Sequence, residues 1–161
     1  MSSDTHPEWL RTWSATLTAR DGGRFALRLL RPEDVELLTE YFLSLSDCTR
    51  ILYGPHPFDR ETAEKLCAER EPDILRLVTV QELAGGPRFA SYFILFLRRP
   101  KDAARFGGAL AEHTSSLAPS VRDDLQSSGL GSLVMPEVLS LARDPWVLRR
   151  CWTTLLSPGV S

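Results

Sequence analysis

The residues best suited to chemistry lie in one stretch, from Val121 to Arg143. Its centre is Gln126-Ser127-Ser128-Gly129-Leu130-Gly131, which leads directly into an apolar segment with helical periodicity. Glycines at the start of a helix let the backbone approach a ligand closely. The N–H groups of the first turn and the positive end of the helix dipole both favour an anion. The stretch therefore predicts a site for an anionic group such as a phosphate.

The stretch differs from the two commonest nucleotide-binding motifs. It has no Lys-Ser/Thr pair after its last glycine, which a phosphate-binding P-loop needs. It also does not follow the first strand of a βαβ repeat, as the glycine loop of dinucleotide-binding folds does. Taken alone, a loop of this kind is equally compatible with a simple turn, so its interpretation depends on the elements around it.

The composition is that of one globular domain. The chain has 161 residues, of which 43% are hydrophobic and 25% are charged, and its net charge at pH 7 is −2. That charge argues against nucleic acid or an anionic membrane as a partner. The first residues lack the basic and apolar regions of a secretory signal, and no apolar run approaches the about 20 residues of a membrane span.

The three cysteines indicate the compartment. Cys48, Cys67 and Cys151 are odd in number and widely spaced, so they form no metal-binding pattern. Such cysteines are typical of reduced thiols. We therefore expect a cytoplasmic protein without a bound metal.

The N-terminal part predicts a polar leader followed by a β-hairpin. Residues 1–11 are mostly polar and are expected to be loosely held, so that a single domain covers residues 12–161. Apolar residues then alternate over 13–19 and 25–30, as in half-buried strands. Between these runs lies Asp21-Gly22-Gly23, in which glycine supplies the positive φ of a tight turn.

Two helices and a second hairpin are expected next. Arg31-Pro32-Glu33-Asp34 opens a helix whose apolar face continues to Leu45. A loop over residues 46–57 follows, and Asp59 is the N-cap of a helix that ends near Arg70. Two runs of β-forming residues come after it, 74–83 and 89–97, around the turn sequence Ala84-Gly85-Gly86-Pro87.

The C-terminal part contains the elements around the glycine loop. The arginine-rich residues 98–111 are interpreted as a solvated segment. A strand over about 114–121 precedes the loop, a helix follows it, and a last strand is expected over 147–156. The order ββ-α-α-β-β-β-α-β predicts an α+β (α/β) fold, with a mixed, mostly antiparallel central sheet flanked by helices. Its last crossover would pair two parallel strands.

With this order of elements, residues 121–131 resemble motif A of the GCN5-related N-acetyltransferases (GNAT), whose signature is Gln/Arg-x-x-Gly-x-Gly/Ala. Arg28-Leu29-Leu30-Arg31-Pro32-Glu33-Asp34 is similar to the family's first strand-to-helix junction. Leu43-Ser44-Leu45-Ser46 is similar to the end of its first helix. The resemblance covers roughly residues 12 to 156. It implies an acyl-CoA N-acyltransferase fold that lacks the family's last helix and strands.

The resemblance implies an acetyl-CoA site. Backbone N–H groups from Ser127 to Ser132 would surround the pyrophosphate, and serine hydroxyls would add donors. The strand that ends at Val121 would separate from its neighbour and bind the pantetheine arm through its backbone. The implied cofactor-binding residues are Val121, Gln126, Ser127, Ser128, Gly129, Leu130, Gly131 and Ser132.

Three features depart from the family's pattern. Pro119 has no N–H to donate from the strand, and Pro136 lies inside the expected helix, where proline costs about 3 kcal/mol or causes a kink. The chain also stops at Ser161, where the family continues, and no tyrosine follows Tyr92 to serve as the family's acid. We expect a C-terminus that is truncated or shifted in frame, with an uncovered sheet edge that a second copy would cover.

Acetyl transfer needs a neutral amine, so a side chain or a chain of waters must take a proton from it. Glu112 and His113, at the start of the strand before the loop, are the candidates for this role. A charged residue at a strand end is also commonly just exposed. His56, between two prolines, could line an acceptor pocket or belong only to its loop.

Two functions from different classes are compatible with these residues. The first is an acetyl-CoA-dependent N-acetyltransferase that acetylates a primary amine of a small molecule or a protein. The second is a non-catalytic CoA-binding or dimerising interaction module derived from the same fold. The short C-terminus and the absent tyrosine favour the second function, whereas the glycine loop favours cofactor binding in either case.

Overall fold

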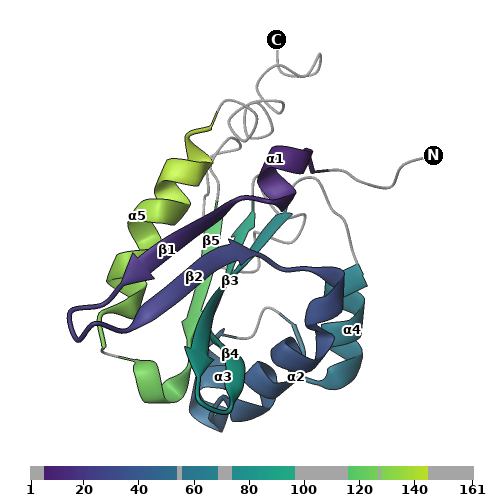
Figure 1. Cartoon of the computed structure of the whole chain (residues 1–161). Coiled ribbons are helices and arrows are strands. Elements are labelled where there is room, and N and C mark those ends of the chain that lie inside the picture. The colour runs from purple at the N-terminus through teal and green to yellow at the C-terminus, as the bar shows by residue number, and fades with distance from the viewer. Residues whose placement is uncertain (1–5, 54–55, 69–73, 97–115, 127, 145–161) are drawn as a thin grey trace, which may run out of the picture.

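The computed structural model describes residues 6–53, 56–68, 74–96, 116–126 and 128–144. Within these ranges, an antiparallel sheet of five strands in sequence order forms the centre of the molecule (Figure 1). The strands are β1 (Ser14–Thr18), β2 (Arg24–Leu29), β3 (Ile74–Leu83), β4 (Gly86–Phe96) and β5 (Ser116–Val121). The helices are α1 (Glu8–Arg11), η1 (Pro32–Asp34), α2 (Val35–Ser44), α3 (Asp47–Tyr53), α4 (Arg60–Ala68), η3 (Asp123–Leu125) and α5 (Leu130–Ala142).

Both predicted hairpins are present. In the β1–β2 turn, Gly22 has a φ of +91° and donates its N–H to the carbonyl of Ala19 at 2.9 Å. The N–H of Gly23 is held by Oδ1 of Asp21 at 2.8 Å. Gly86 supplies the positive φ of the β3–β4 turn. The turn residues fix the register of each hairpin. This register matters because a one-residue slip would move the apolar side chains to the opposite face of the sheet.

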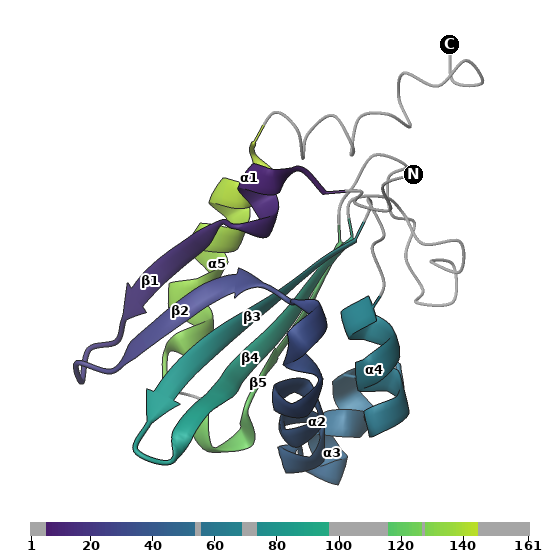
Figure 2. The same ribbon diagram turned by 45° about the vertical axis from the view of Figure 1, so that its right-hand side comes forward.

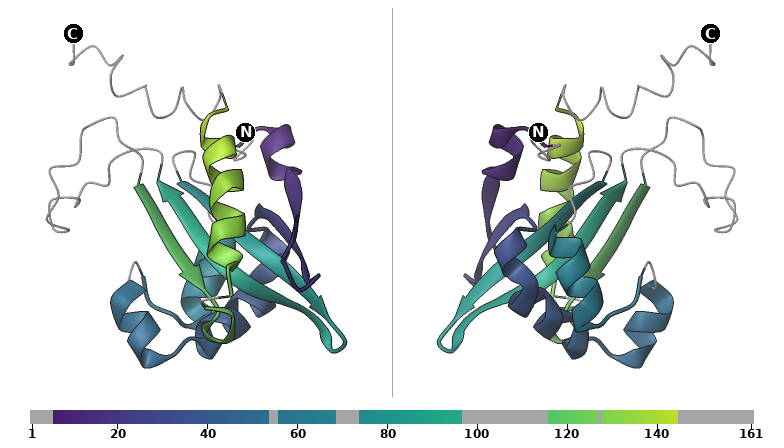
Figure 3. Two further views of the ribbon diagram at one scale, coloured as in Figure 1. Left: turned by 90° about the vertical axis from the view of Figure 1, so that its left-hand side faces the viewer. Right: turned by 90° about the vertical axis from the view of Figure 1, so that its right-hand side faces the viewer.

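Helices cover both faces of the sheet (Figures 2 and 3). Helix α5 packs on one face through the buried side chains Leu130, Val134, Val138 and Leu141, whose spacing puts them on one side of the helix. Helices α2 and α4 pack on the other face. Buried residues of β3 and β4 contribute to both cores, as expected for strands in the middle of a three-layer arrangement.

Strand β4 contains a β-bulge. Thr79 pairs with Ser91 whereas its neighbour Val80 pairs with Phe89, so that Ala90 is an extra residue on β4. The carbonyl of Ala90 accepts the N–H of Arg122 at 2.8 Å, immediately after β5. The bulge thus helps to hold the chain where it leaves β5.

Two predictions about local structure are wrong. Residues 46–57 are not simply a loop, because α3 begins within them; Oγ of Ser46 accepts the N–H of Thr49 at 3.1 Å and caps this helix. The leader is not loosely held throughout, because α1 places Leu10 fully within the core against the α5 face of the sheet. Both elements are a few residues long, and tertiary contacts stabilise them where sequence periodicity is too short to be recognised.

Pro136 does not interrupt α5, which runs from Leu130 to Ala142. Its side chain is exposed, on the opposite side of the helix from Val134 and Val138. Proline has no N–H, so the carbonyl four residues before it has no partner within the helix. This carbonyl faces the solvent side, where water can bind it. The predicted last strand over 147–156 and the arginine-rich residues 98–111 lie outside the described residues.

Candidate functional site

The start of α5 presents backbone donors to open space. The N-cap is Gly129 with a φ of +91°, and no side chain caps the helix. A Cβ built on Gly131 would meet no atom within 4 Å. The first turn carries no acidic residue, and the adjacent Leu130 is buried in the core and anchors the turn. N–H groups of the first turn have no acceptor within a helix, so this terminus has the geometry and polarity of an anion site.

Gln126 and Ser128 shape the loop instead of pointing into it. Nε2 of Gln126 donates to the carbonyl of Val121 at 3.1 Å and to Oγ1 of Thr49 at 3.4 Å. Both the N–H and the hydroxyl of Ser128 donate to the carbonyl of Leu125. Among the described residues, these bonds leave the N–H groups from Gly129 to Ser132 as the donors of the loop. Ser127 lies outside the described residues.

The backbone of β5 alternates between its neighbour and the outer edge. The N–H of Arg122 donates to the carbonyl of Ala90, so these two residues form a hydrogen-bonded pair. Hydrogen-bonded pairs recur at every second position of an antiparallel ladder, so Ser120 and Tyr92 form the next one. Pro119 and Phe93 form a non-hydrogen-bonded pair, in which the backbone N–H and C=O positions of the β5 residue point away from β4. Its missing N–H would therefore face the outer edge, which explains why the sheet tolerates a proline here.

Two charged side chains hold the segment between β5 and α5 against the helices. Arg122 is buried, and its Nε donates to the carbonyl of Phe89 at 2.9 Å while its two terminal nitrogens bind both carboxylate oxygens of Glu40. Its guanidinium also lies over the ring of Tyr41. Asp123 accepts the N–H of Ser46 at 3.1 Å. The glycine loop is thus tied to α2 and to the start of α3.

Buried hydroxyl groups lie behind the edge strand. Oη of Tyr41 is 2.7 Å from Oγ of Ser120, which donates to the carbonyl of Tyr92 at 3.1 Å. Since the Ser120 hydroxyl gives its hydrogen to that carbonyl, Tyr41 is the donor in the first bond. Burial raises the pKa of Tyr41, so this phenol stays protonated. These bonds connect α2 directly to β5, and the Ser120 hydroxyl in turn connects β5 to β4 at Tyr92.

The side chain of Tyr92 forms a second network with Arg76 and His56. Its Oη accepts from Nη1 of Arg76 at 3.0 Å and is 3.1 Å from Nε2 of His56. Nδ1 of His56 is 2.8 Å from the carbonyl of Pro57, which can only accept, so Nδ1 carries the hydrogen. Burial, followed by the charge of Arg76, lowers the pKa of His56. Nε2 of the neutral ring then accepts the hydrogen of Tyr92.

The structure brings together only some of the residues that the sequence selected. The described residues from Val121 to Ser132 lie between the end of β5 and the first turn of α5. His56 packs among Phe42, Phe58 and Tyr92. Glu112 and His113 lie outside the described residues. Sequence reasoning missed Arg122 and Glu40, because no periodicity reveals that an arginine at a strand end is buried.

Across the described part of the chain, no group of three His, Cys, Asp or Glu side chains is arranged to bind a metal ion. No helix in that part is long and apolar enough to cross a membrane.

Three solved structures are similar to the chain in fold. The GNAT domain of S. lividans PAT has a TM-score of 0.63 and 20% sequence identity, over 86% of this chain and 75% of that one. The ribosomal-protein-S5-alanine acetyltransferase from Vibrio fischeri has a TM-score of 0.56 and 11% identity, over 84% and 78%. Mycobacterium smegmatis RimJ, solved in complex with CoA-disulfide, has a TM-score of 0.56 and 16% identity, over 94% and 66%.

At the level of sequence, no family profile and no curated protein matches the chain. The similarity in fold is nevertheless consistent across the three structures, with TM-scores of 0.56 to 0.63. The chain has the GNAT fold, so the predicted relationship to that family is confirmed at the level of the fold.

Proposed function

We propose that the protein is an acetyl-CoA-dependent N-acetyltransferase that binds the cofactor pyrophosphate at the start of α5. The observation that carries this proposal is the helix terminus itself, which begins at a glycine with φ of +91° and has neither a side-chain cap nor an acid in its first turn. The N–H groups of Gly129, Leu130, Gly131 and Ser132 would donate to the phosphates. The hydroxyl of Ser132 and residue Ser127 would add further donors.

The pantetheine arm would lie along the outer edge of β5. Leu117, Pro119 and Val121 alternate with the residues that bond to β4, so their backbone groups point to that edge. Pro119 can offer only its carbonyl, and the carbonyl of Val121 already accepts from Gln126. The edge thus provides the N–H groups of Leu117 and Val121 and two carbonyls for the arm.

Acetyl-CoA would supply an activated acyl group. A neutral amine would attack this group, which then moves from sulfur to nitrogen. The C–S bond breaks as the C–N bond forms; the amine loses one proton and the departing thiolate gains one. Glu112 and His113 are the candidates that the sequence offers for the proton acceptor. His56 is not a further candidate, because its Nε2 already accepts the hydrogen of Tyr92 and its Nδ1 donates to the carbonyl of Pro57. The acceptor would be a primary amine of a small molecule or a protein.

Titration calorimetry with acetyl-CoA tests the cofactor site. The chain should bind with a dissociation constant in the micromolar range, and Gly131→Glu should weaken binding at least tenfold by placing a carboxylate among the donors. The same substitution should raise the free energy of unfolding by about 1 kcal/mol, because glutamate is a better helix former than glycine and favours the first turn. Loss of stability together with loss of binding would point to misfolding instead.

Ser140→Glu is the matched control. It adds the same charge to the same helix at an exposed position near the other end. Acetyl-CoA affinity should stay within about twofold of the unmodified chain, since the added charge is far from the phosphates. Absence of binding heat at millimolar acetyl-CoA in the unmodified chain would contradict the cofactor site altogether.

A second candidate function is a non-catalytic CoA-binding or dimerising module. Pro119 favours it, because this residue removes one backbone donor from the edge on which the arm would lie. A thiol-release assay over a panel of small amines and peptides distinguishes the two functions. Release above the rate of hydrolysis supports the transferase, whereas tight cofactor binding without release supports the module. A cytoplasmic location and a homodimer stay predictions of the sequence.

A further inference from the structure

The outer edge of β5 ends beside a side chain that imitates a ligand. Val121 is the last residue of β5 and pairs with Ser91 in a non-hydrogen-bonded position. Its N–H and its carbonyl therefore both point away from β4. Nε2 of Gln126 donates to this carbonyl at 3.1 Å. Gln126 thus occupies an acceptor on the edge with an amide N–H, the same group that an extended ligand brings to a strand edge.

The side chain of Gln126 is held only lightly in this position. It is exposed, and its second contact, from Nε2 to Oγ1 of Thr49, is 3.4 Å long. The position of Thr49 does not depend on this contact, because its hydroxyl donates to Asp123 at 3.2 Å. Rotation of Gln126 therefore breaks two exposed hydrogen bonds that water replaces, at a small net cost in free energy.

The carbonyl of Val121 lies on the path of the pantetheine arm. An arm that follows the outer edge of β5 to phosphates at the first turn of α5 passes Val121, because the strand ends there. The arm carries two amide groups, and each of their N–H groups needs an acceptor once it leaves water. Pro119 offers no N–H to the arm, so the carbonyls of this edge carry more of the binding.

We propose that Gln126 is a built-in competitor for the pantetheine arm. Its amide holds the Val121 carbonyl in the free protein, and an N–H of the arm replaces it when the cofactor binds. One N–H···O=C bond breaks and another forms, while the Gln126 side chain turns into solvent. The inference rests on the proposed function and adds to it a residue that lowers the affinity for the arm but not for the phosphates.

Titration calorimetry of Gln126→Met tests this role. Methionine has a similar length but no N–H, so the Val121 carbonyl is free. Acetyl-CoA affinity should rise about threefold to tenfold, which corresponds to the net strength of a neutral hydrogen bond. Gln126→Ala should give a rise of the same size, which excludes a new contact from the methionine. Unchanged or weaker binding in both variants would overturn the competitor, and weaker binding would mean that Gln126 contacts the cofactor directly.

A ligand without the arm separates the two parts of the site. 3′-Phosphoadenosine 5′-diphosphate carries the phosphates but no amide, so its affinity should be the same within about twofold in the unmodified chain and in Gln126→Met. A rise equal to that for acetyl-CoA would contradict competition with the arm. The melting temperature of Gln126→Met without ligand should stay within about 3 °C of the unmodified chain. A larger fall would contradict a lightly held side chain.

Gln81→Met is the matched control. Gln81 is the other glutamine of the chain; it lies on β3, which β4 separates from β5, and its Oε1 accepts from Nε of Arg88 at 2.9 Å. Acetyl-CoA affinity in this variant should stay within about twofold. A rise equal to that in Gln126→Met would show that the effect does not come from the edge of β5.

Nuclear magnetic resonance observes the exchange directly. With only two glutamines in the sequence, ¹⁵N labelling of glutamine gives two pairs of side-chain amide signals, and Gln81→Met assigns them. Saturation with acetyl-CoA should move the Gln126 pair to the positions of a solvated amide and leave the Gln81 pair in place. Unchanged Gln126 signals would overturn the competitor while leaving the proposed function intact. Absence of acetyl-CoA binding in every variant would instead contradict the proposed function, and this inference with it.

Discussion

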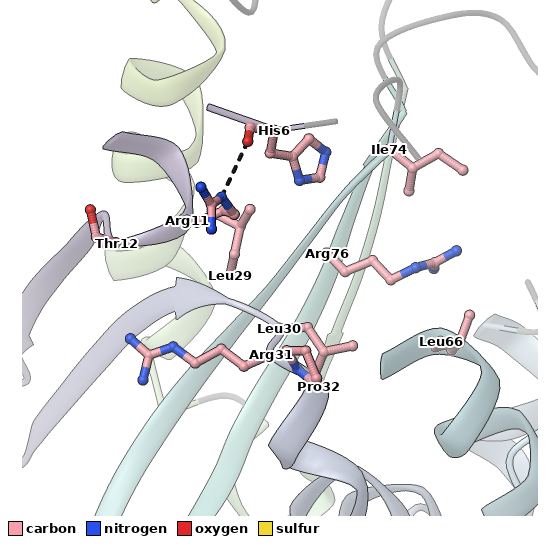
Figure 4. Close-up of a pocket in the computed structure, with 10 residues that line it drawn as sticks. All are labelled: His6, Arg11, Thr12, Leu29, Leu30, Arg31, Pro32, Leu66, Ile74 and Arg76. Carbon is pink, nitrogen blue, oxygen red and sulfur yellow. Dashed lines mark hydrogen bonds between the residues drawn. The ribbon is translucent and has the colours of Figure 1, made fainter. Parts of the chain in front are cut away.

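The two ends of the sheet use arginine in different ways. Where β5 leads to α5, Arg122 is buried and held by Glu40 and by the carbonyl of Phe89, so an anion there would meet backbone N–H groups. At the opposite end, Arg31 lines a cavity (Figure 4) and pairs with no carboxylate among the described residues. Burial and partners, not residue type, therefore decide whether an arginine stabilises the fold or remains available to a ligand.

The largest expected effect is a loss of stability on replacing Arg122, at the end of the sheet where β5 leads to α5. Arg122→Met keeps the volume but removes the bonds to Glu40 and to the buried carbonyl of Phe89. The free energy of unfolding should fall by about 2–4 kcal/mol in urea denaturation, mainly because that carbonyl loses its partner. Glu40 is half exposed and can be solvated, which limits the loss.

Arg31→Met at the second end completes the comparison. It removes a guanidinium with no carboxylate partner among the described residues, so the free energy of unfolding should change by less than about 0.5 kcal/mol. Similar losses for both arginines, measured under the same conditions, would contradict the distinction between a structural and an available arginine.

The two glycines of the loop should respond with opposite signs. Gly129→Ala places a Cβ on a residue with φ of +91° and should cost about 1 kcal/mol of stability. Gly131→Ala adds a methyl group in open space within the first turn of α5 and should gain up to about 1 kcal/mol. Thermal or chemical denaturation of the pair measures both. A loss at Gly131 would show that its backbone conformation also requires glycine.

The smallest expected effect concerns pH and the network that fixes Arg76. The folded-state pKa of His56 is lowered from 6.5 by burial, so the unfolded chain binds more protons than the folded chain at mildly acidic pH. This contribution is fully present above about pH 6.5, and it is lost as the pH falls through the lowered value. His56→Gln should therefore show a smaller loss of unfolding free energy between pH 7.5 and 5.5 than the unmodified chain. An identical loss would show that His56 does not contribute.

Local patterns predicted the elements that are long or marked by strong turn residues. The first hairpin follows from alternation and Asp21-Gly22-Gly23, and α4 follows from Asp59, whose Oδ1 accepts the N–H of Thr62 at 2.8 Å as an N-cap should. The junction from Arg28 to Asp34 was recognised as well, although its bidentate ion pair was not foreseen. Helix α3 was missed, because its stability comes from bonds such as that of Thr49 to Asp123, 74 residues away.

The sequence by itself determined the glycine loop, its neighbouring elements and hence the GNAT fold, because turn residues, caps and periodicity act over a few residues. Only the tertiary structure decided what individual polar side chains do. It bound Gln126 and Ser128 to the backbone carbonyls of Val121 and Leu125, buried Arg122, and placed Arg11, Arg31 and Arg76 around one cavity. Such roles depend on partners distant in the chain, and local patterns carry no information about them.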